Sequence, residues 1–201
     1  MINSSPYRSL TIDGIAKRTA GDLVVAHHYL HRKPPMSYAF GIWDDLDVLG
    51  VCTFGTPPSR HAQMSVCPSD PSMALELNRL WIDDDLPGNT ASWFVAGCLR
   101  LLPPRIVFSY ADTAVGHHGG VYRAMSWNYA GQTDEDRKTP RFDYVPDNGN
   151  HSRDAFRTGE FTRVRRKPKH RYWTTTGSAR QRRRMVGLCG WDARPYPEVA
   201  A

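Results

Sequence analysis

The chain has 201 residues, 40% of them hydrophobic, which is enough to bury a core for one domain without disulfide support. Its four cysteines are widely separated and form no CxxC pair, which excludes a secreted disulfide scaffold and favours a reducing compartment. The formal net charge is +6, and because the N-terminus has no signal-peptide pattern and no apolar stretch can span a bilayer, we expect a cytoplasmic protein without membrane contacts.

The first half of the chain predicts a helix among strands. Apolar residues at helical spacing predict a helix over residues 16–32, ended by Pro34 and Pro35. Residues 56–72 are rich in proline and serine and are predicted to form a loop. β-Branched and aromatic residues or apolar–polar alternation predict strands at residues 9–15, 38–43, 48–55 and 75–82, the middle two joined as a hairpin by an acidic turn.

The second half predicts two more helices and two more strands. The helices are expected at residues 90–102 and 119–125, and the strands at residues 105–112 and 127–131. Residues 142–156 have no clear period and are predicted to form a long loop. The order of elements predicts an α/β fold in which a mixed central sheet is flanked by helices on both faces.

The basic residues concentrate in a C-terminal segment. Residues 163–184 hold ten of the 26 Lys and Arg and no acidic residue, so the remainder carries 16 basic against 20 acidic groups. Cations interleaved with aromatic rings are typical of a nucleic-acid surface, because cations neutralise phosphates and rings stack on bases. A solvated tail is the alternative, whereas membrane binding is disfavoured because the segment has no apolar helical face. The predicted DNA-contacting residues are Arg163, Arg165, Arg166, Lys167, Lys169, Arg171, Tyr172, Trp173, Arg180, Arg182, Arg183 and Arg184.

Three histidines and a tyrosine gather at the end of the first predicted helix, as His27, His28, Tyr29 and His31. A single histidine there is usually a surface group or a satisfied core group, but three together raise the odds that one is functional. On a helix, His27 and His31 would lie one turn apart on the same face, whereas His28 and Tyr29 would point away from that face and could lie on the rim of a cleft.

Asp112 ends a predicted strand, where ligands of α/β proteins commonly bind, although a helix cap is an equally good interpretation. A metal site with two histidines and one carboxylate could combine His28, Asp112 and either His117 or His118, but the spacing does not require it. Ser92 lies at the start of a predicted helix. The free backbone N–H groups there could bind an anion, or nearby side chains could simply cap the helix.

Seven short strings together resemble the Mom family of bacteriophage DNA-modification proteins: AHHYLHRKP, FGTPP, ELNRLWID, NTASWF, VFSYAD, GHHGGVYRAMSWNYAG and KHRYW. The resemblance implies a fold similar to GCN5-related N-acetyltransferases and the conversion of adenine in double-stranded DNA to N6-carbamoylmethyladenine, which protects phage DNA from host restriction. We therefore expect residues 1–160 to form the catalytic domain and residues 161–201 to form a basic DNA-contacting extension packed on it. The resemblance does not predict an oligomeric state.

The resemblance also implies which side chains act. The family's functional residues fall on His28, Tyr29, Arg79, Ser92, Asp112 and Tyr122. Of these, His28, Tyr29, Asp112 and Tyr122 are expected to be catalytic, and Arg79 and Ser92 to bind a cofactor. Iron is associated with the family, and His28 and Asp112 would be its ligands. His27 and His31 are then expected to be structural or surface groups.

The sequence argues against acetyl-coenzyme A as the group donor. Where coenzyme A enzymes carry a glycine-spaced loop, residues 81–93 hold three aspartates, which repel a pyrophosphate. Transfer through an acetyl carbonyl also gives an N-acyl adenine and not a bond from N6 to a methylene carbon. The donor is therefore expected to be a glycine-like unit, or a redox step at a metal must intervene.

Adenine N6 is a weak nucleophile, so either a base such as His28 or Asp112 takes its proton or the carbon that it attacks must be strongly activated. We also expect the adenine to flip out of the duplex onto Tyr29, Tyr122 or Trp127. Two other functions fit the residues: an acetyl-coenzyme-A-dependent N-acetyltransferase of a protein or small amine, and a non-catalytic phage DNA-binding protein.

Overall fold

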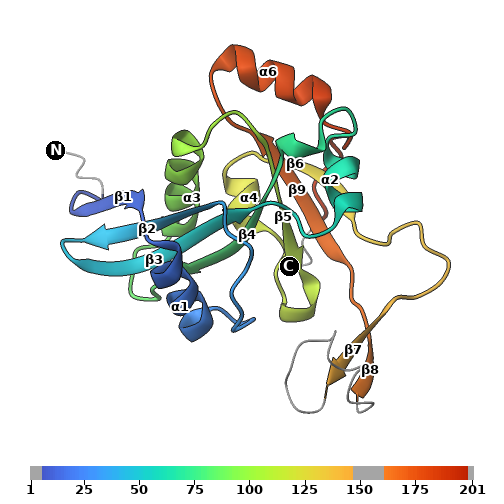
Figure 1. The fold of residues 1–201 in the computed structure, drawn as a ribbon, viewed down its shortest axis with the longest axis horizontal. Helices are drawn as coiled ribbons and strands as arrows, with labels where there is room; N and C mark the ends of the chain where they lie inside the picture. The colour runs from blue at the N-terminus through green and yellow to red at the C-terminus, as the bar shows by residue number, and fades with distance from the viewer. Residues whose placement is uncertain (1–5, 147–160, 199–201) are drawn as a thin grey trace.

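The structure is a computed structural model that describes residues 6–146 and 161–198 (Figure 1). Its centre is a seven-stranded sheet in the order β1-β2-β3-β4-β5-β9-β6. These strands are β1 (Leu10–Gly14), β2 (Tyr38–Asp44), β3 (Asp47–Gly55), β4 (Ala74–Ile82), β5 (Ile106–Asp112), β9 (Lys169–Thr175) and β6 (Asn128–Gln132). The pair β4–β5 is parallel and the other neighbouring pairs are antiparallel. The predicted mixed α/β sheet is therefore confirmed.

Helices cover both faces of the sheet, as expected. Within the described residues the helices are α1 (Lys17–His27), α2 (Arg60–Val66), α3 (Thr90–Leu101), α4 (Gly120–Ala124) and α6 (Ala179–Leu188), and the 3-10 turns are η1 (Pro71–Met73) and η2 (Thr113–Val115). Alternation along the strands divides the core: Cys52 packs with α3, whereas its neighbour Val51 packs with α1. Ile106 and Phe108 pack with residues of α2 and α6 on the α1 side of the sheet. All four cysteines are free thiols.

Two predicted loops contain regular structure. Helix α2 forms inside the predicted loop 56–72 because Ser59 caps it, accepting the Ala62 amide at 3.4 Å, and because Val66 is buried. The predicted loop 142–156 begins with β7 (Phe142–Pro146), which pairs with β8 (Phe161–Arg165) as a separate hairpin. The rest of that predicted loop lies outside the described residues.

The basic segment contributes a strand to the middle of the sheet. Strand β9 lies between β5 and β6, so residues on both sides of position 160 share one sheet. Tyr172 and Trp173 are 0% and 3% exposed, because a central strand is covered on both faces. Their predicted role as stacking residues for DNA is therefore wrong, since both rings are already packed in the core. Within residues 6–146 and 161–198, no helix has the length and apolarity needed to cross a bilayer.

Candidate functional site

A pocket opens where β4 and β5 separate. The two strands pair only from Ala74 to Glu76 and from Ile106 to Phe108, although β4 continues to Ile82 and β5 to Asp112. The diverging parts of both strands line a cavity of about 630 Å³, which the end of α1 and the loop before α4 complete. This volume falls within the range of small-ligand sites, roughly 300–1,000 Å³. The branching of the sheet thus creates the site, and we call this cavity the fork pocket.

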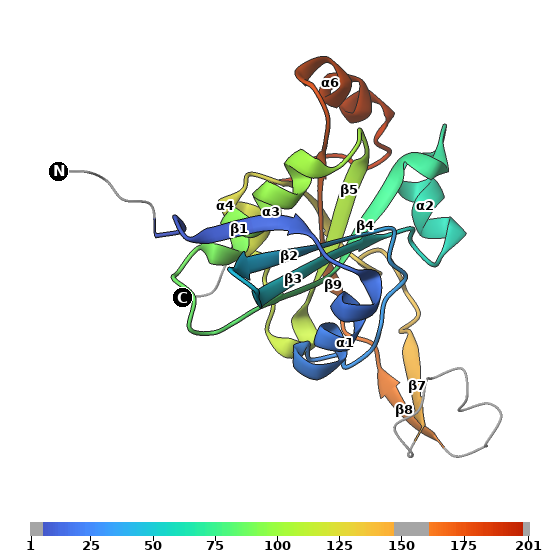
Figure 2. The same cartoon turned by 60° about the vertical axis from the view of Figure 1, so that its left-hand side comes forward.

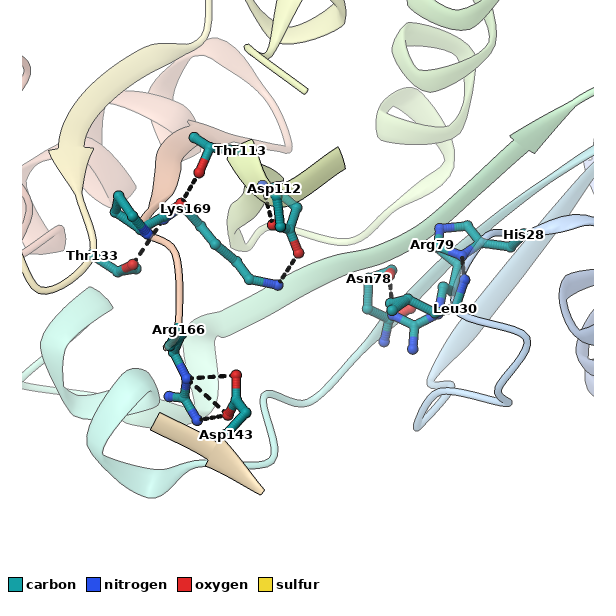
Figure 3. Close-up of polar contacts among 12 residues, drawn as sticks. His28, Leu30, Asn78, Arg79, Asp112, Thr113, Thr133, Asp143, Arg166 and Lys169 are labelled. Carbon is teal, nitrogen blue, oxygen red and sulfur yellow. Dashed lines mark hydrogen bonds and ion pairs between the residues drawn. The ribbon is translucent and has the colours of Figure 1, made fainter. Parts of the chain in front are cut away.

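The fork pocket gathers most of the side chains expected from the sequence. His28, Tyr29, Arg79 and Tyr122 all line it. Among the described residues that line the pocket, Asp112 is absent but Lys169 is present. The Nζ of Lys169 lies 2.6 Å from the Asp112 carboxylate (Figure 3). His117 and His118 also line the pocket, as the sequence allowed.

His28 is held by its own backbone neighbour. Helix α1 ends at His27, several residues before its predicted end, because His28 is extended and His31 has a φ of 44°. The Leu30 amide donates to His28 Nδ1 at 3.1 Å, so the proton of the neutral ring is on Nε2. Burial, followed by the charge of Arg79, lowers the pKa of His28 to about 4. At neutral pH the ring is therefore a hydrogen-bond donor through Nε2.

Each carboxylate oxygen of Asp112 already has a partner. Burial alone would raise its pKa, but the bonds from Lys169 and from the Ala114 amide, the latter at 2.9 Å, bring it below its usual value. The carboxylate caps η2, which is the structural role that the sequence left open. Asp112 is thus an ionised anchor for Lys169.

Tyr122 belongs to a buried chain of hydrogen bonds. Ser109 donates to the Leu77 carbonyl at 2.8 Å, so the Tyr122 hydroxyl, 2.7 Å away, must donate to Ser109 Oγ. Burial raises the pKa of Tyr122, and its ring packs against Trp127 and Tyr172. Tyr122 therefore forms part of the fixed wall of the pocket.

Of the three rings expected to receive a flipped base, Tyr29 alone is well exposed. Its exposed fraction is 41%, against 9% for Tyr122 and 1% for Trp127. The Tyr29 ring stacks on His28 at 4.4 Å between centroids and meets the edge of His117. Trp127 is buried and has no exposed ring face, so the expectation that it stacks on a flipped adenine is wrong.

The other two histidines of the first cluster have structural contacts. His27 stacks on Trp81 at 4.2 Å, and the His31 ring bonds the Val25 carbonyl at 2.8 Å. Because α1 has ended before His31, the two rings do not share a helical face. These contacts fit the structural or surface role expected for both.

Ser92 does not reach the pocket. Its hydroxyl donates to the Asn89 carbonyl at 2.9 Å, and Thr90 donates to the Pro87 carbonyl at 2.5 Å. Both hydroxyls are therefore used inside the turn that starts α3. Among the described residues of the pocket wall, none comes from this turn.

The loop before α4 requires glycine at one position. Gly119 has a φ of 77°, and a Cβ there would clash with the Tyr172 ring. The Tyr172 hydroxyl donates to the His118 carbonyl at 2.8 Å. The buried strand β9 thus fixes the loop that carries His117 and His118 to the pocket.

Sequence reasoning missed Glu76 and assigned Lys169 to DNA. Both line the fork pocket. Burial raises the pKa of Glu76 to about 7, although Arg79 and Lys169 act in the opposite direction. The available signal was an acidic residue inside an apolar strand, but only the separation of β4 from β5 shows that it faces a cavity.

The expected iron ligands do not fit an iron site as arranged. His28 Nδ1 already accepts the Leu30 amide, and metal binding through Nε2 would require that nitrogen to lose its proton. The Asp112 oxygens are bound to Lys169 and Ala114. In the described parts of the chain, no three His, Cys, Asp or Glu side chains cluster to hold a metal.

The remaining basic residues separate into two groups at opposite ends of β9. The first is the β7–β8 hairpin and the residues that follow it, where Arg163 lies over the Phe142 ring at 3.7 Å and Arg166 pairs with Asp143. Arg165 and Lys167 are exposed there. Figures 1 and 2 show this hairpin beyond one end of the sheet and α6 beyond the other.

Helix α6 carries the second group, with Arg180, Arg182, Arg183 and Arg184 all exposed. Lys169 begins β9 and lines the pocket, whereas α6 follows the other end of that strand. Seven residues of strand separate the two ends by roughly 20 Å. Arg171, between them, lies over the Trp191 ring.

Comparisons with known proteins add a family and a set of neighbours. The model of the Mom protein family matches residues 9–197. Methylcarbamoylase Mom of Escherichia phage Mu is 30% identical over 131 residues, which cover 62% of this chain and 54% of that protein, so this chain spans about half of that protein's length.

Two solved acetyltransferases resemble the structure. An N-acetyltransferase from Staphylococcus aureus has a TM-score of 0.46 at 10% identity, covering 83% of this chain and 98% of that one. The polyamine N-acetyltransferase of Drosophila melanogaster has a TM-score of 0.48 at 12% identity, covering 83% and 99%.

Proposed function

Since the chain belongs to the Mom protein family, we propose that it is a DNA-modifying transferase that attaches a carbamoylmethyl group to adenine N6. The name of the phage Mu relative, methylcarbamoylase, supports this reaction class. The observation that carries the proposal is the fork pocket, where His28, Tyr29, Arg79 and Tyr122 meet. The biological role would be protection of phage DNA from host restriction enzymes.

The adenine would enter the pocket by leaving the duplex. In a base pair N6 is engaged in Watson–Crick hydrogen bonding, and enzymes that act on a base usually flip it out at a cost of a few kcal/mol. The exposed ring of Tyr29 provides a stacking surface that offsets part of this cost. Beside it, the His28 Nε2 proton can bond a ring nitrogen of the adenine.

Arg79 is the candidate to hold the donor. Its Nε is buried without a hydrogen-bond partner among the described residues, and one terminal nitrogen donates to the Asn78 carbonyl at 2.6 Å. A buried guanidinium with free donors suits a carbonyl oxygen or an anionic leaving group. This fits the amide of a carbamoylmethyl unit.

The product constrains the chemistry. Its new bond joins N6 to a methylene carbon and its amide survives, so attack occurs at that carbon and not at a carbonyl. The bond from the methylene carbon to the leaving group of the donor breaks, and the leaving group takes the electron pair. A glycine-like unit activated at this carbon satisfies this requirement, whereas acetyl-coenzyme A does not.

The DNA contact would lie on the side of the β7–β8 hairpin. Arg163 and Arg165 of β8 and the exposed Lys167 precede Lys169, which lines the pocket. A duplex whose base occupies the pocket is thus near these cations, which can neutralise its phosphates. The arginines of α6 lie at the opposite end of β9 and are expected to contribute less.

Nucleoside mass spectrometry tests the function. Plasmid DNA recovered from cells expressing the protein should contain a deoxyadenosine heavier by one carbamoylmethyl group, which is absent from cells with an empty vector. Unmodified DNA from cells in which the protein is folded and binds DNA would contradict the proposal and favour a non-catalytic binding protein. An acetylated protein or amine in the same cells would favour the acetyltransferase alternative.

A further inference from the structure

Glu76 occupies the base of the fork pocket. It is the last residue of β4 that pairs with β5, opposite Phe108, and on its other side it pairs with Gly55 of β3. Its backbone is therefore fixed from both sides at the point where the strands separate. Its side chain lines the cavity, so this carboxylate is presented to a bound ligand by a rigid element.

The Glu76 carboxylate is not held by a hydrogen bond. Within residues 6–146 and 161–198, neither a hydrogen bond nor an ion pair reaches it, although Asp112 at the neighbouring strand end has both. The charged and titratable groups that influence it are Arg79 on its own strand, Lys169 on β9, Tyr110 on β5 and Tyr122 on α4. A carboxylate that lines a cavity without a protein partner keeps its oxygens available to a bound ligand, either as hydrogen-bond acceptors or as acceptors of a proton.

The proposed reaction needs a group that accepts a proton from adenine N6. The neutral His28 ring carries its proton on Nε2, and its Nδ1 is used by Leu30. Asp112 is paired with Lys169, and the Tyr122 hydroxyl is bonded to Ser109. Both bases expected from the sequence are therefore engaged, and Glu76 remains as the free acceptor.

We propose that Glu76 is the catalytic base of the fork pocket, an inference that rests on the proposed function. As N6 bonds to the methylene carbon, its proton passes to the Glu76 carboxylate. The leaving group of a donor with an activated methylene carbon departs with the electron pair of the broken bond. The products are N6-carbamoylmethyladenine, the protonated glutamic acid and the released group, so atoms and charge balance.

The pH dependence gives a signature that a structural role lacks. A carboxylate accepts a proton only when it is ionised, and burial brings the pKa of Glu76 to about 7. The rate should therefore rise from pH 5, reach half of its maximum near pH 7 and level off above about pH 8 as the ionised fraction increases. A glutamine at this position cannot ionise, so its residual activity should lack this rise.

The test measures the rate of carbamoylmethyladenine formation on plasmid DNA in an extract of expressing cells, from pH 5 to 9. Glu76→Gln should lower the rate by roughly 10²–10⁴-fold, which is the usual contribution of a general base. It should also abolish the acidic limb of the pH profile, that is, the rise in rate from pH 5 upwards. Glu135→Gln is the matched control, because it makes the same change in an exposed carboxylate paired with Arg194, and its rate should equal that of the intact protein.

The outcomes separate the two proposals. Product formation by the intact protein together with an unchanged rate and pH profile for Glu76→Gln would overturn the role of Glu76 and leave the function intact. Absence of product from the intact protein would overturn the function. Should Glu76→Gln fail to fold, Glu76→Asp decides: it retains a carboxylate and should keep the acidic limb at a lower rate, and a profile without that limb would contradict the inference.

Discussion

Among single residues, His28 shows how local structure changes an assignment. Its place beside a helix end and its match to the family's motif made it a candidate base and metal ligand. The Leu30 amide that bonds Nδ1 instead fixes the tautomer, which makes the ring a donor. The sequence identified the residue correctly as part of the pocket, but its protonation depends on a contact two residues away that no motif specifies.

The protonation state of His28 gives a prediction that NMR can check. Because burial lowers the pKa of His28 to about 4, its ring resonances should stay constant from pH 8 to pH 5. The unfolded chain binds this proton near pH 6.5, so the contribution of His28 to stability should fall as the pH drops from about 6.5 towards 4. A titration midpoint near 6.5 in the folded protein would contradict the assignment.

Among the elements, those with a clear apolar period were predicted and those fixed by tertiary contacts were not. The hairpin of β2 and β3 and helix α3 follow from alternation or helical spacing. Strand β9 was not predicted, because Lys169 and Arg171 and the basic residues on either side of the strand resemble a surface segment, although Tyr172 and Trp173 are core residues. The density of basic residues therefore gave a wrong prediction for a central strand whose charged residues lie at one end.

The two basic elements should differ in their effect on DNA binding. Replacing Arg163 and Arg165 with serine should weaken binding and reduce the slope of log K against log salt by up to about 2, since each phosphate contact contributes about 0.9. The matched change in α6, Arg182 and Arg183 to serine, should have a smaller effect. Fluorescence anisotropy with a labelled duplex over a salt series compares them, and an equal or larger loss for the α6 pair would refute the proposed DNA path.

For the whole molecule, the sequence predicted the class of fold but not the opening that forms the site. A mixed sheet with helices on both faces follows from the order of the elements. The separation of β4 from β5 after only three paired residues depends on partners distant in the sequence. It brings Glu76 and Lys169 into one cavity with His28 and Arg79, a grouping that no spacing along the chain reveals.

The central claim is that the fork pocket is where DNA is modified, and a large side chain added to its wall tests that claim without removing any functional side chain. Gly120 lines the pocket, and a Cβ at this position would meet no atom within 4 Å. Gly187 on α6 has equally open surroundings and serves as the control.

The decisive measurement is mass spectrometry of nucleosides from plasmid DNA of cells that express the intact protein, Gly120→Leu or Gly187→Leu. We predict carbamoylmethyladenine with the intact protein and with Gly187→Leu, and at least a tenfold loss with folded Gly120→Leu. Equal modification by Gly120→Leu and the intact protein would contradict the assignment of the pocket.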